Sequence, residues 1–331
     1  MEKNLSALGF MSGTSGDGVD TSVISSNGKD TINIKYNRFD PYPTSLTKKI
    51  HNVKESISKM QDLLKYSFDI EELEREITDF HAEIATKISK NIDYDLIGFH
   101  GHTIYHNSDE KISKQIGLGV NLSNLTNKTV VYDFRQKDIK NGGEGAPLSP
   151  IYHLALVKKL FSENKLKIPI SILNIGGIAN ITEIDKDFNI VSRDIGPGNC
   201  LIDKWVRKNS NKLFDKNGNL AKQGKTDKFI FDQYLENYYY SKINCKRSLD
   251  TNDFDISFAK GLSLENGTST ITDLTSELLS KKIGTNDIYV CGGGRKNKFL
   301  INSLKNKINN KIFSIDHLNF DGDYIESQAF A

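Results

Sequence analysis

Cysteine is scarce in this chain, and no stretch of it stays apolar for long. The three cysteines, Cys200, Cys245 and Cys291, are odd in number and far apart, which argues against a disulfide framework or a structural zinc site. No run of about 18 apolar residues occurs, and the N-terminus lacks an apolar core of signal-peptide length. These absences predict a cytoplasmic protein with no membrane partner.

Neither sign of charge dominates either. The 44 basic side chains nearly balance the 42 acidic ones, so electrostatics give no indication of a nucleic-acid partner. At 331 residues the chain is long for one hydrophobic core, and we expect two domains. The change of pattern near residue 128 places the first domain at residues 1–128 and the second at residues 129–331.

Hydrophobic periodicity predicts a strand meander followed by alternating helices and strands, twice over. Such a pattern is typical of an α/β protein with two related halves. We expect strands at residues 5–10, 19–25, 31–39, 95–99, 129–132, 170–174, 178–184, 189–192, 288–291 and 311–315. We expect helices at residues 45–66, 69–90, 150–162, 199–209, 226–239, 269–283 and 296–308.

Three glycine turns each follow a strand-like run, at residues 11–20, 173–180 and 290–295. Glycine lets the backbone present N–H groups to phosphate oxygens, so three such turns suggest a nucleotide held from several sides. In the first turn, Asp17 and Asp20 would imply a divalent cation beside the phosphates. A plain hairpin turn is the alternative. Neither a Walker motif nor a dinucleotide fingerprint is present, which points to another nucleotide fold.

Asp194 is the candidate reacting group, in the sequence Asp194-Ile195-Gly196-Pro197-Gly198-Asn199. A carboxylate at a strand end, held by a Gly-Pro-Gly turn, can accept a proton from a hydroxyl or a water, an effect worth about 10²–10⁴ in rate. The alternative role, capping the helix that begins near Asn199, places Asp194 too far upstream.

Arg135 follows a buried strand, between Asp133 and Asp138. Its guanidinium suits a carboxylate or a pair of sugar hydroxyls, and a structural ion pair at a domain junction is the alternative. His100, His102 and His106 could form a metal cluster, but no acidic partner has ligand spacing. We expect His100 to hydrogen bond to substrate without a metal.

Several ordered motifs resemble those of the anhydro-N-acetylmuramic acid kinases, bacterial wall-recycling enzymes of the sugar kinase/Hsp70/actin superfamily. The resemblance covers essentially the whole chain. It rests on Gly9-Phe10-Met11-Ser12-Gly13-Thr14-Ser15, Phe99-His100-Gly101-His102-Thr103, Asp133-Phe134-Arg135, Gly143-Glu144-Gly145-Ala146-Pro147-Leu148, residues 173–182, residues 194–199, Cys291-Gly292-Gly293-Gly294-Arg295 and Glu326-Ser327-Gln328-Ala329-Phe330-Ala331.

This resemblance implies a two-domain actin-like ATPase (ribonuclease H-like) fold with a cleft between the domains. It implies ATP and Mg²⁺ as cofactors, Asp194 as the catalytic base, and Arg135 and Glu326 as residues that hold the sugar. A homodimer would be ordinary for such a fold. The residues expected at the nucleotide are Gly13, Thr14, Ser15, Gly16, Asp17, Gly18, Val19, Asp20, Gly176, Gly177, Gly292, Gly293 and Gly294.

The implied reaction converts 1,6-anhydro-N-acetylmuramic acid, water and ATP to N-acetylmuramic acid 6-phosphate and ADP, in peptidoglycan recycling and amino sugar catabolism. Two alternatives stay open: a kinase of the same superfamily acting on another sugar or small acid, and a non-catalytic regulator that binds ATP or a muropeptide.

The chain departs from the family pattern in four places. His102 stands where glutamine is usual, and Gly16 where a larger apolar residue is usual. Residues 246–254 differ from the family's lysine-threonine-glycine-arginine-glutamate stretch, so we expect an altered arginine contact there. The last residues read as a helix that stops at Ala331, and we expect the family's further C-terminal elements to be missing.

Overall fold

The computed structural model describes residues 4–13, 15–241, 243 and 248–331. The chain divides into two compact units, Met1–Leu166 with Asp323–Ala331, and Lys167–Gly322. The boundary predicted at residue 128 therefore lies inside the first unit. The physical reason is strand pairing, because the strand that begins at Thr129 runs parallel to a strand of the first sheet and completes it.

The first unit contains a six-stranded sheet. An antiparallel meander is followed by a strand parallel to the first one, which in turn pairs with two further strands. The order is β3-β2-β1-β4-β5, and β6 also pairs with β4. The strands are β1 (Leu5–Ser12), β2 (Gly18–Ser26), β3 (Ile32–Pro41), β4 (Leu96–Asn107), β5 (Ile112–Ile116) and β6 (Thr129–Tyr132).

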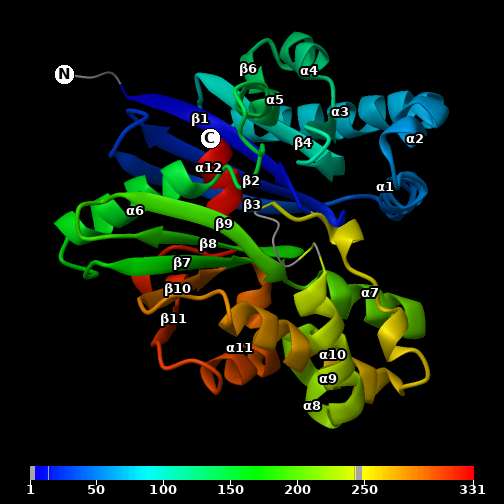
Figure 1. Cartoon of the computed structure of the whole chain (residues 1–331). Coiled ribbons are helices and arrows are strands. Elements are labelled where there is room, and N and C mark those ends of the chain that lie inside the picture. The colour runs from blue at the N-terminus through cyan, green and yellow to red at the C-terminus, as the bar shows by residue number, and fades with distance from the viewer. Residues whose placement is uncertain (1–3, 14, 242, 244–247) are drawn as a thin grey trace. The chain divides into compact units, whose positions relative to one another are not determined.

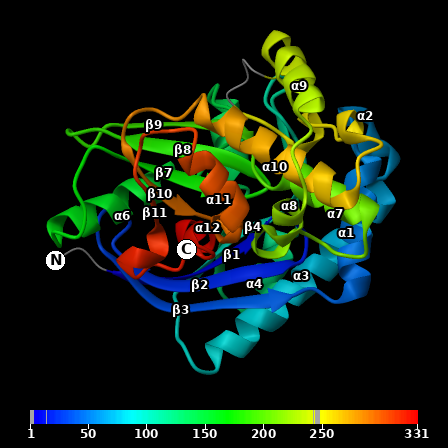
Figure 2. The same ribbon diagram turned by 90° about the horizontal axis from the view of Figure 1, so that it is seen from below.

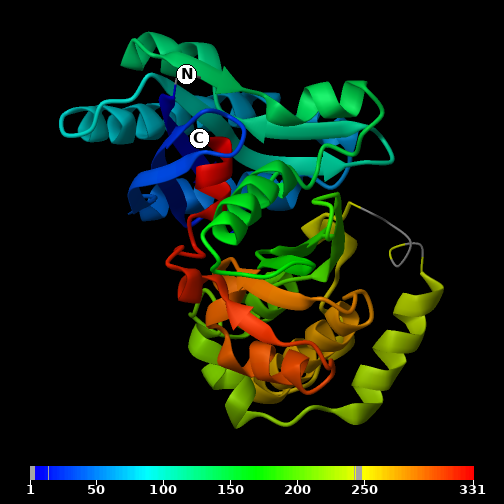
Figure 3. The ribbon, with the colours of Figure 1, turned by 90° about the vertical axis from the view of Figure 1, so that its left-hand side faces the viewer.

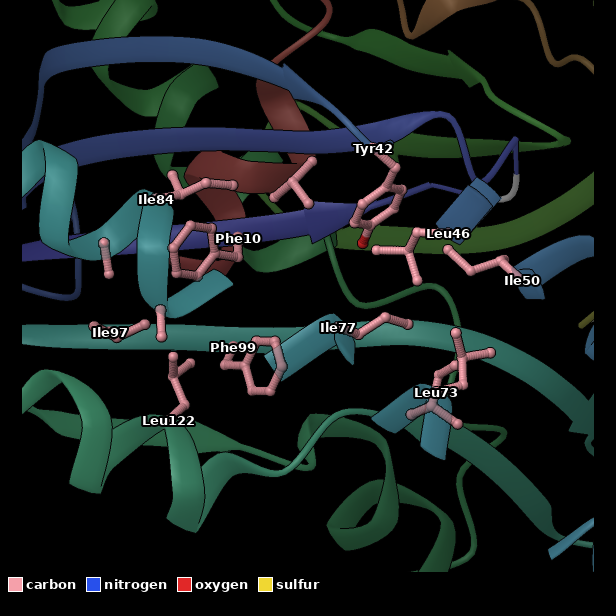
Figure 4. Close-up of a cluster of buried hydrophobic side chains, with 14 of the residues drawn as sticks. Phe10, Tyr42, Leu46, Ile50, Leu73, Ile77, Ile84, Ile97, Phe99 and Leu122 are labelled. Atoms are coloured by element: carbon pink, nitrogen blue, oxygen red, sulfur yellow. The ribbon is translucent and has the colours of Figure 1, made fainter. Parts of the chain in front are cut away.

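Helices cover this sheet with their apolar faces. Figure 4 shows Phe10 of β1 and Phe99 of β4 packed among leucine and isoleucine side chains of the helices, which together form the core of the unit. The helices are α1 (Thr44–Ser56), α2 (Met60–Lys65), α3 (Ser67–Ser89), α4 (Gly119–Thr126), α5 (Phe134–Lys140), α6 (Pro150–Ser162) and α12 (Ile325–Phe330).

The single helix predicted over residues 45–66 is two helices. Asp62 explains the break, because its Oδ2 accepts hydrogen bonds from the backbone N–H of Ser58 at 3.0 Å and of Lys59 at 3.1 Å. These N–H groups lie ahead of α2, and satisfying them there starts a new helix. Strand β4 also continues eight residues beyond the predicted end at residue 99, to Asn107, and forms a hairpin with β5.

The C-terminal helix α12 belongs to the first unit, although it follows the second unit in sequence (Figures 1 and 3). It packs on β1 and β2, and two glycines of the sheet, Gly9 of β1 and Gly98 of β4, lie against it. A Cβ on Gly9 or Gly98 would collide with the backbone of α12 at Ser327 or Phe330. These two glycines therefore allow the helix to lie directly against the strands.

The second unit has a five-stranded sheet in the order β11-β10-β7-β8-β9. β7, β8 and β9 form an antiparallel meander, while β10 and β11 run parallel to β7. The strands are β7 (Ile170–Ile175), β8 (Ile178–Ile184), β9 (Ile190–Pro197), β10 (Asp287–Cys291) and β11 (Ile312–Ser314).

Among the described residues, one hydrophobic cluster of this unit contains Trp205 and lies mainly among helices, and another joins the strands to α10 and α11. The central helix α10 packs on β9 and against α7 and α11, as can be followed in Figure 2. The helices are α7 (Cys200–Asn209), α8 (Asn219–Gln223), α9 (Lys228–Tyr240), α10 (Leu264–Ser280) and α11 (Lys298–Lys305).

The two units repeat one topology. In each, three antiparallel strands come first and two parallel strands extend the sheet beyond the first strand: β4 and β6 in one unit, β10 and β11 in the other. This arrangement confirms the predicted α/β class with two related halves of the actin-like (ribonuclease H-like) type. Among the described residues, no helix is both long and apolar enough to cross a membrane.

Candidate functional site

The first glycine turn joins β1 to β2, so a hairpin is present at this position. The N–H of Gly16 donates to the carbonyl of Gly13 at 3.0 Å, and Gly16 has a φ of +60°, which favours glycine. The hydroxyl of Ser15 donates to Asp17 Oδ1 at 2.5 Å. Gly18, Val19 and Asp20 are strand residues of β2, and Thr14 lies outside the described residues. The turn thus exposes a hydroxyl and a carboxylate beside its glycines.

A chain of buried hydrogen bonds fixes Ser12, the residue immediately before this turn. The Tyr42 hydroxyl donates to Ser12 Oγ at 3.0 Å, and Ser12 Oγ lies 3.0 Å from His102 Nδ1. Ser12 is the last residue of β1, immediately before the turn. Burial lowers the pKa of His102 well below its usual value, and nearby Lys54 lowers it further, so the ring is neutral. The chain fixes the point at which the turn leaves the strand.

Arg135, in the first turn of α5, is held by His100 and Gly145. Its Nε and Nη2 lie 3.2 Å and 3.0 Å from His100 Nε2, and its Nη1 donates to the Gly145 carbonyl at 2.6 Å. The other ring nitrogen of His100, Nδ1, is 2.9 Å from the Gly101 carbonyl. Both nitrogens of His100 thus contact groups of the chain itself, and the expected hydrogen bond from His100 to substrate stays a prediction.

Glu326 lies on the same side of the first unit as this pair. The Phe330 ring of α12 is centred 4.7 Å from the His100 ring. Glu326 precedes Phe330 by four residues, so the two side chains share one face of the helix. The structure therefore brings His100, Arg135 and α12 together, although they are far apart in sequence. His106 lies further along β4, where its Nδ1 is 2.9 Å from Ser113 Oγ.

Asp194 lies in β9 of the second unit, three residues before the strand ends. Its side chain is 5% exposed, and its Oδ2 accepts a hydrogen bond from the backbone N–H of Leu249 at 2.8 Å. A β-bulge follows it directly, between the pairs that join Asn180 to Asp194 and Ala179 to Gly196. Residues 244–247, which include part of the altered stretch 246–254, lie outside the described residues.

The second glycine turn supports the loop after Asp194. The N–H of Gly198 donates to the Gly177 carbonyl at 2.9 Å, and the N–H of Asn199 to the Gly176 carbonyl at 2.8 Å. Asn199 begins the approach to α7, so these bonds fix the Gly-Pro-Gly turn against the β7–β8 hairpin. The carbonyls of Gly176 and Gly177 thus accept hydrogen bonds from the chain itself, and both residues remain partly exposed.

The third glycine turn follows β10, and its glycines differ in their surroundings. Added Cβ atoms would collide with Asn174 at Gly292 and with Ile175 at Gly294, whereas at Gly293 nothing lies within 4 Å. Gly293 is exposed, Gly292 is half-buried and Gly294 is buried, so Gly293 is the most accessible of the three to a ligand.

Arg295, which follows the third turn, holds it in place. It donates to the Gly292 carbonyl at 3.1 Å, to Asp316 at 2.9 Å and to Asp321 at 3.1 Å. Burial raises the pKa of Asp316, but the bonds from Arg295, Gly322 and Ser314 outweigh it and lower this pKa to about 2. The turn is therefore anchored by a carboxylate that stays charged.

Sequence reasoning missed the groups that hold the candidate residues. These partners are backbone atoms or distant side chains, and only the motif position of Gly145 signalled one of them. They are Tyr42 for Ser12, the Gly145 carbonyl for Arg135, the Leu249 N–H for Asp194, and Asp316 and Asp321 for Arg295.

Comparisons with known proteins point to one family over nearly the whole chain. The family model described as anhydro-N-acetylmuramic acid kinase matches residues 5–331. A protein of that name from Pelagibacter ubique is 45% identical, over 100% of this chain and 91% of the other. One from Rhizobium johnstonii is 34% identical, over 98% and 90%. A solved structure, the activator of the 2-hydroxyisocaproyl-CoA dehydratase from Clostridium difficile with bound ADPNP, has a TM-score of 0.44 at 12% identity, covering 98% of this chain and 92% of that one. That structural likeness is too distant to carry an argument.

Proposed function

The chain belongs to the anhydro-N-acetylmuramic acid kinase family, and we propose that it uses Asp194 as the catalytic base and Arg135 and Glu326 to hold the sugar. It is an ATP-dependent kinase whose substrate is 1,6-anhydro-N-acetylmuramic acid. Its place is in the recycling of peptidoglycan and the catabolism of amino sugars.

The buried Asp194 carboxylate is the observation that supports this proposal best. The Leu249 N–H holds one of its oxygens, and the bulge after it interrupts the strand pairing. A carboxylate fixed in this way needs little reorganisation before it takes a proton. No other acidic side chain among the site residues combines burial with a strand position.

The proposed reaction balances as one coupled displacement. Asp194 takes a proton from a water molecule while the water oxygen bonds to the anomeric carbon of the sugar. The bond between that carbon and the bridging O6 breaks, and O6 attacks the γ-phosphorus of ATP. The bond from that phosphorus to the β–γ bridging oxygen then breaks, which releases ADP and leaves N-acetylmuramic acid 6-phosphate. The proton on Asp194 passes to solvent.

The ATP phosphates would lie at the first glycine turn. Gly13 and Ser15 offer backbone N–H groups there, Gly16 closes the turn through its own bond to Gly13, and the carboxylate of Asp17 faces solvent. Backbone N–H groups in such a turn form a concavity that suits phosphate oxygens. The adenosine would lie at the second unit's glycine turns, with the exposed Gly293 as the contact residue.

Mg²⁺ fits the donor chemistry of the same turn. Asp17 and Asp20 supply hard carboxylate oxygens, and Mg²⁺ usually binds through one or two carboxylates together with substrate phosphates. When bound, the ion would neutralise charge on the phosphates. The proposal also includes a cytoplasmic location and a homodimer, the commonest assembly of soluble proteins.

An assay of ADP release with product mass analysis tests the function. With Mg-ATP and 1,6-anhydro-N-acetylmuramic acid, we expect a product heavier than the sugar by one phosphoryl group and one water. In ¹⁸O-labelled water, the label should appear once, at the anomeric hydroxyl. Phosphorylation of a reducing sugar without uptake of water would instead identify an ordinary sugar kinase, and ADP release that no sugar stimulates would contradict both.

A further inference from the structure

His100 is a neutral hydrogen-bond acceptor in this structure. Its Nδ1 faces the Gly101 carbonyl at 2.9 Å, and because a carbonyl only accepts, Nδ1 carries the proton. Nε2 therefore presents a lone pair, which matches the N–H donors of Arg135. The pKa of His100 is lowered to about 3, mainly by burial and secondly by the positive charge of Arg135. The ring stays neutral at any pH near neutrality.

The guanidinium of Arg135 is fixed from two directions. His100 Nε2 receives Nε and Nη2 on one side, and the Gly145 carbonyl receives Nη1 on the other. Gly145 is itself held, because its N–H donates to Asp138 Oδ2 at 2.7 Å. Because the guanidinium is held at both ends, the orientation of its plane is fixed. A planar guanidinium in a fixed orientation is well suited to bind a carboxylate.

The ring of His100 is also fixed by packing. The Phe330 ring of α12 is centred 4.7 Å from the His100 ring, and the Phe134 ring is centred 5.1 Å from that of Phe330. His100 is therefore held by a backbone carbonyl and an aromatic ring. The ring cannot turn toward a ligand without breaking its hydrogen bonds from Arg135.

We infer that His100 is a positioning residue, which orients Arg135 to bind the lactyl carboxylate of the sugar and so sets the preference for acidic over neutral anhydro sugars. This inference rests on the proposed function. N-acetylmuramic acid differs from N-acetylglucosamine only in its lactyl ether, which carries the carboxylate. Removing the orientation of Arg135 should therefore cost affinity for the acidic sugar and leave the neutral one nearly unchanged.

The test compares 1,6-anhydro-N-acetylmuramic acid with 1,6-anhydro-N-acetylglucosamine in wild type, His100→Ala, His100→Gln and Arg135→Ala. Calorimetric binding and the kcat and KM of turnover are measured for each sugar. We expect His100→Ala to weaken binding of the acidic sugar and raise its KM about 10- to 100-fold, since a charge-assisted contact is lost. The neutral sugar should change by less than about twofold. Gln offers an acceptor to Arg135, so His100→Gln should recover part of the preference.

A matched control is His106→Gln, a buried histidine of the same strand that contacts Ser113 instead. It should keep the wild-type preference. An equal loss for both sugars in His100→Ala, or an unchanged preference, would overturn the inference. So would the loss of a pH inflection in His100→Gln, which would identify His100 as an acid or base. Failure of the proposed function is separate, because wild type would then bind the acidic sugar without turning it over.

Discussion

Asp194 lies directly opposite Asn180 in the antiparallel pairing of β9 with β8. The row continues across the sheet, because Asn180 pairs with Asn174 of β7, and Asn174 pairs with Cys291 of β10. Residues paired in this way project from the same face of a sheet. All four are buried, and Asn180 Oδ1 has no hydrogen-bond partner among the described residues. The carboxylate therefore ends a row of buried polar side chains fixed by strand register.

Replacing Asp194 with Asn should abolish most turnover without unfolding the protein. An amide oxygen can still accept the hydrogen bond from the Leu249 N–H, so the local structure is kept. An amide cannot take a proton from water, and we expect kcat to fall about 10²- to 10⁴-fold. The measurement is kcat with 1,6-anhydro-N-acetylmuramic acid, together with the Tm of both proteins.

Asp227→Asn is the matched control for this substitution. Asp227 also lies in the second unit, and its carboxylate caps α9 by accepting from the Ile230 N–H at 3.0 Å. Asn caps helices about as well as Asp, so both kcat and Tm should stay near wild type. If Asp194→Asn kept wild-type kcat, another group would have to be the base.

The strands and most helices could be predicted because their signal is local. The run at residues 129–132 and the spacing at residues 150–162 correspond to β6 and α6 as the structure has them. What the sequence could not reveal is pairing at long range. β6 joins the first sheet through β4, and this contact, invisible in the local pattern, moves the boundary from residue 128 to residue 166.

The candidate site shows the same limit. Glycine and acidic motifs indicated Asp194 and Arg135, because their residue types carry chemistry on their own. The contact between His100 and Arg135 was not predicted, since a histidine beside Arg135 in space is not beside it in sequence. The carbonyl of Gly145 and the N–H of Leu249 have no side-chain signature at all. Backbone partners of this kind become visible only once the chain is folded.

His102→Gln should be tolerated, whereas His102→Leu should not. Glutamine can keep a hydrogen bond to Ser12, but leucine leaves the buried Ser12 hydroxyl with only the Tyr42 contact. We expect the leucine variant to lose about 1–3 kcal/mol of unfolding free energy and to show a raised KM for ATP, because the first turn is no longer fixed. Urea unfolding and ATP titration of turnover measure the two effects. Equal behaviour of the two variants would argue against a role of this hydrogen-bond chain.

Gly293→Ala and Gly294→Ala should separate nucleotide binding from stability. The space around Gly293 is open, so its variant should fold normally and raise the KM for ATP about threefold to tenfold if adenosine lies there. A methyl group on Gly294 would collide with Ile175, and overpacking of this kind costs about 1–3 kcal/mol. The measurements are KM for ATP and Tm. An unchanged KM in Gly293→Ala would place the adenosine elsewhere.

The stability of the protein should fall in mild acid, partly because of His81. This ring is fully buried between Phe10 and Phe99, and its Nδ1 donates to the Ile77 carbonyl at 2.7 Å. Burial lowers the pKa of His81 to about 4, and this effect outweighs the hydrogen bond to Ile77, which raises the pKa. The folded chain therefore holds His81 neutral at a pH where the unfolded chain would bind a proton.

The sign of the pH effect follows from proton linkage. Above the unfolded pKa of about 6.5 both states are neutral and stability is complete. As the pH falls below that value the unfolded chain takes up a proton first, and the loss continues until the folded pKa of about 4 is reached. Between about pH 7.5 and about pH 5, His81 should cost about 2 kcal/mol.

His81→Met tests this contribution, because methionine fills buried space without titrating. Unfolding free energies of both proteins are measured in urea at the two pH values, with circular dichroism as the probe. The variant is expected to lose stability at the higher pH through poorer packing, yet to show a pH difference smaller than that of wild type by about 2 kcal/mol. The comparison of differences removes the effect of the other buried histidines, which both proteins share. An equal pH difference in the two proteins would mean that burial of His81 is not a source of the acid sensitivity.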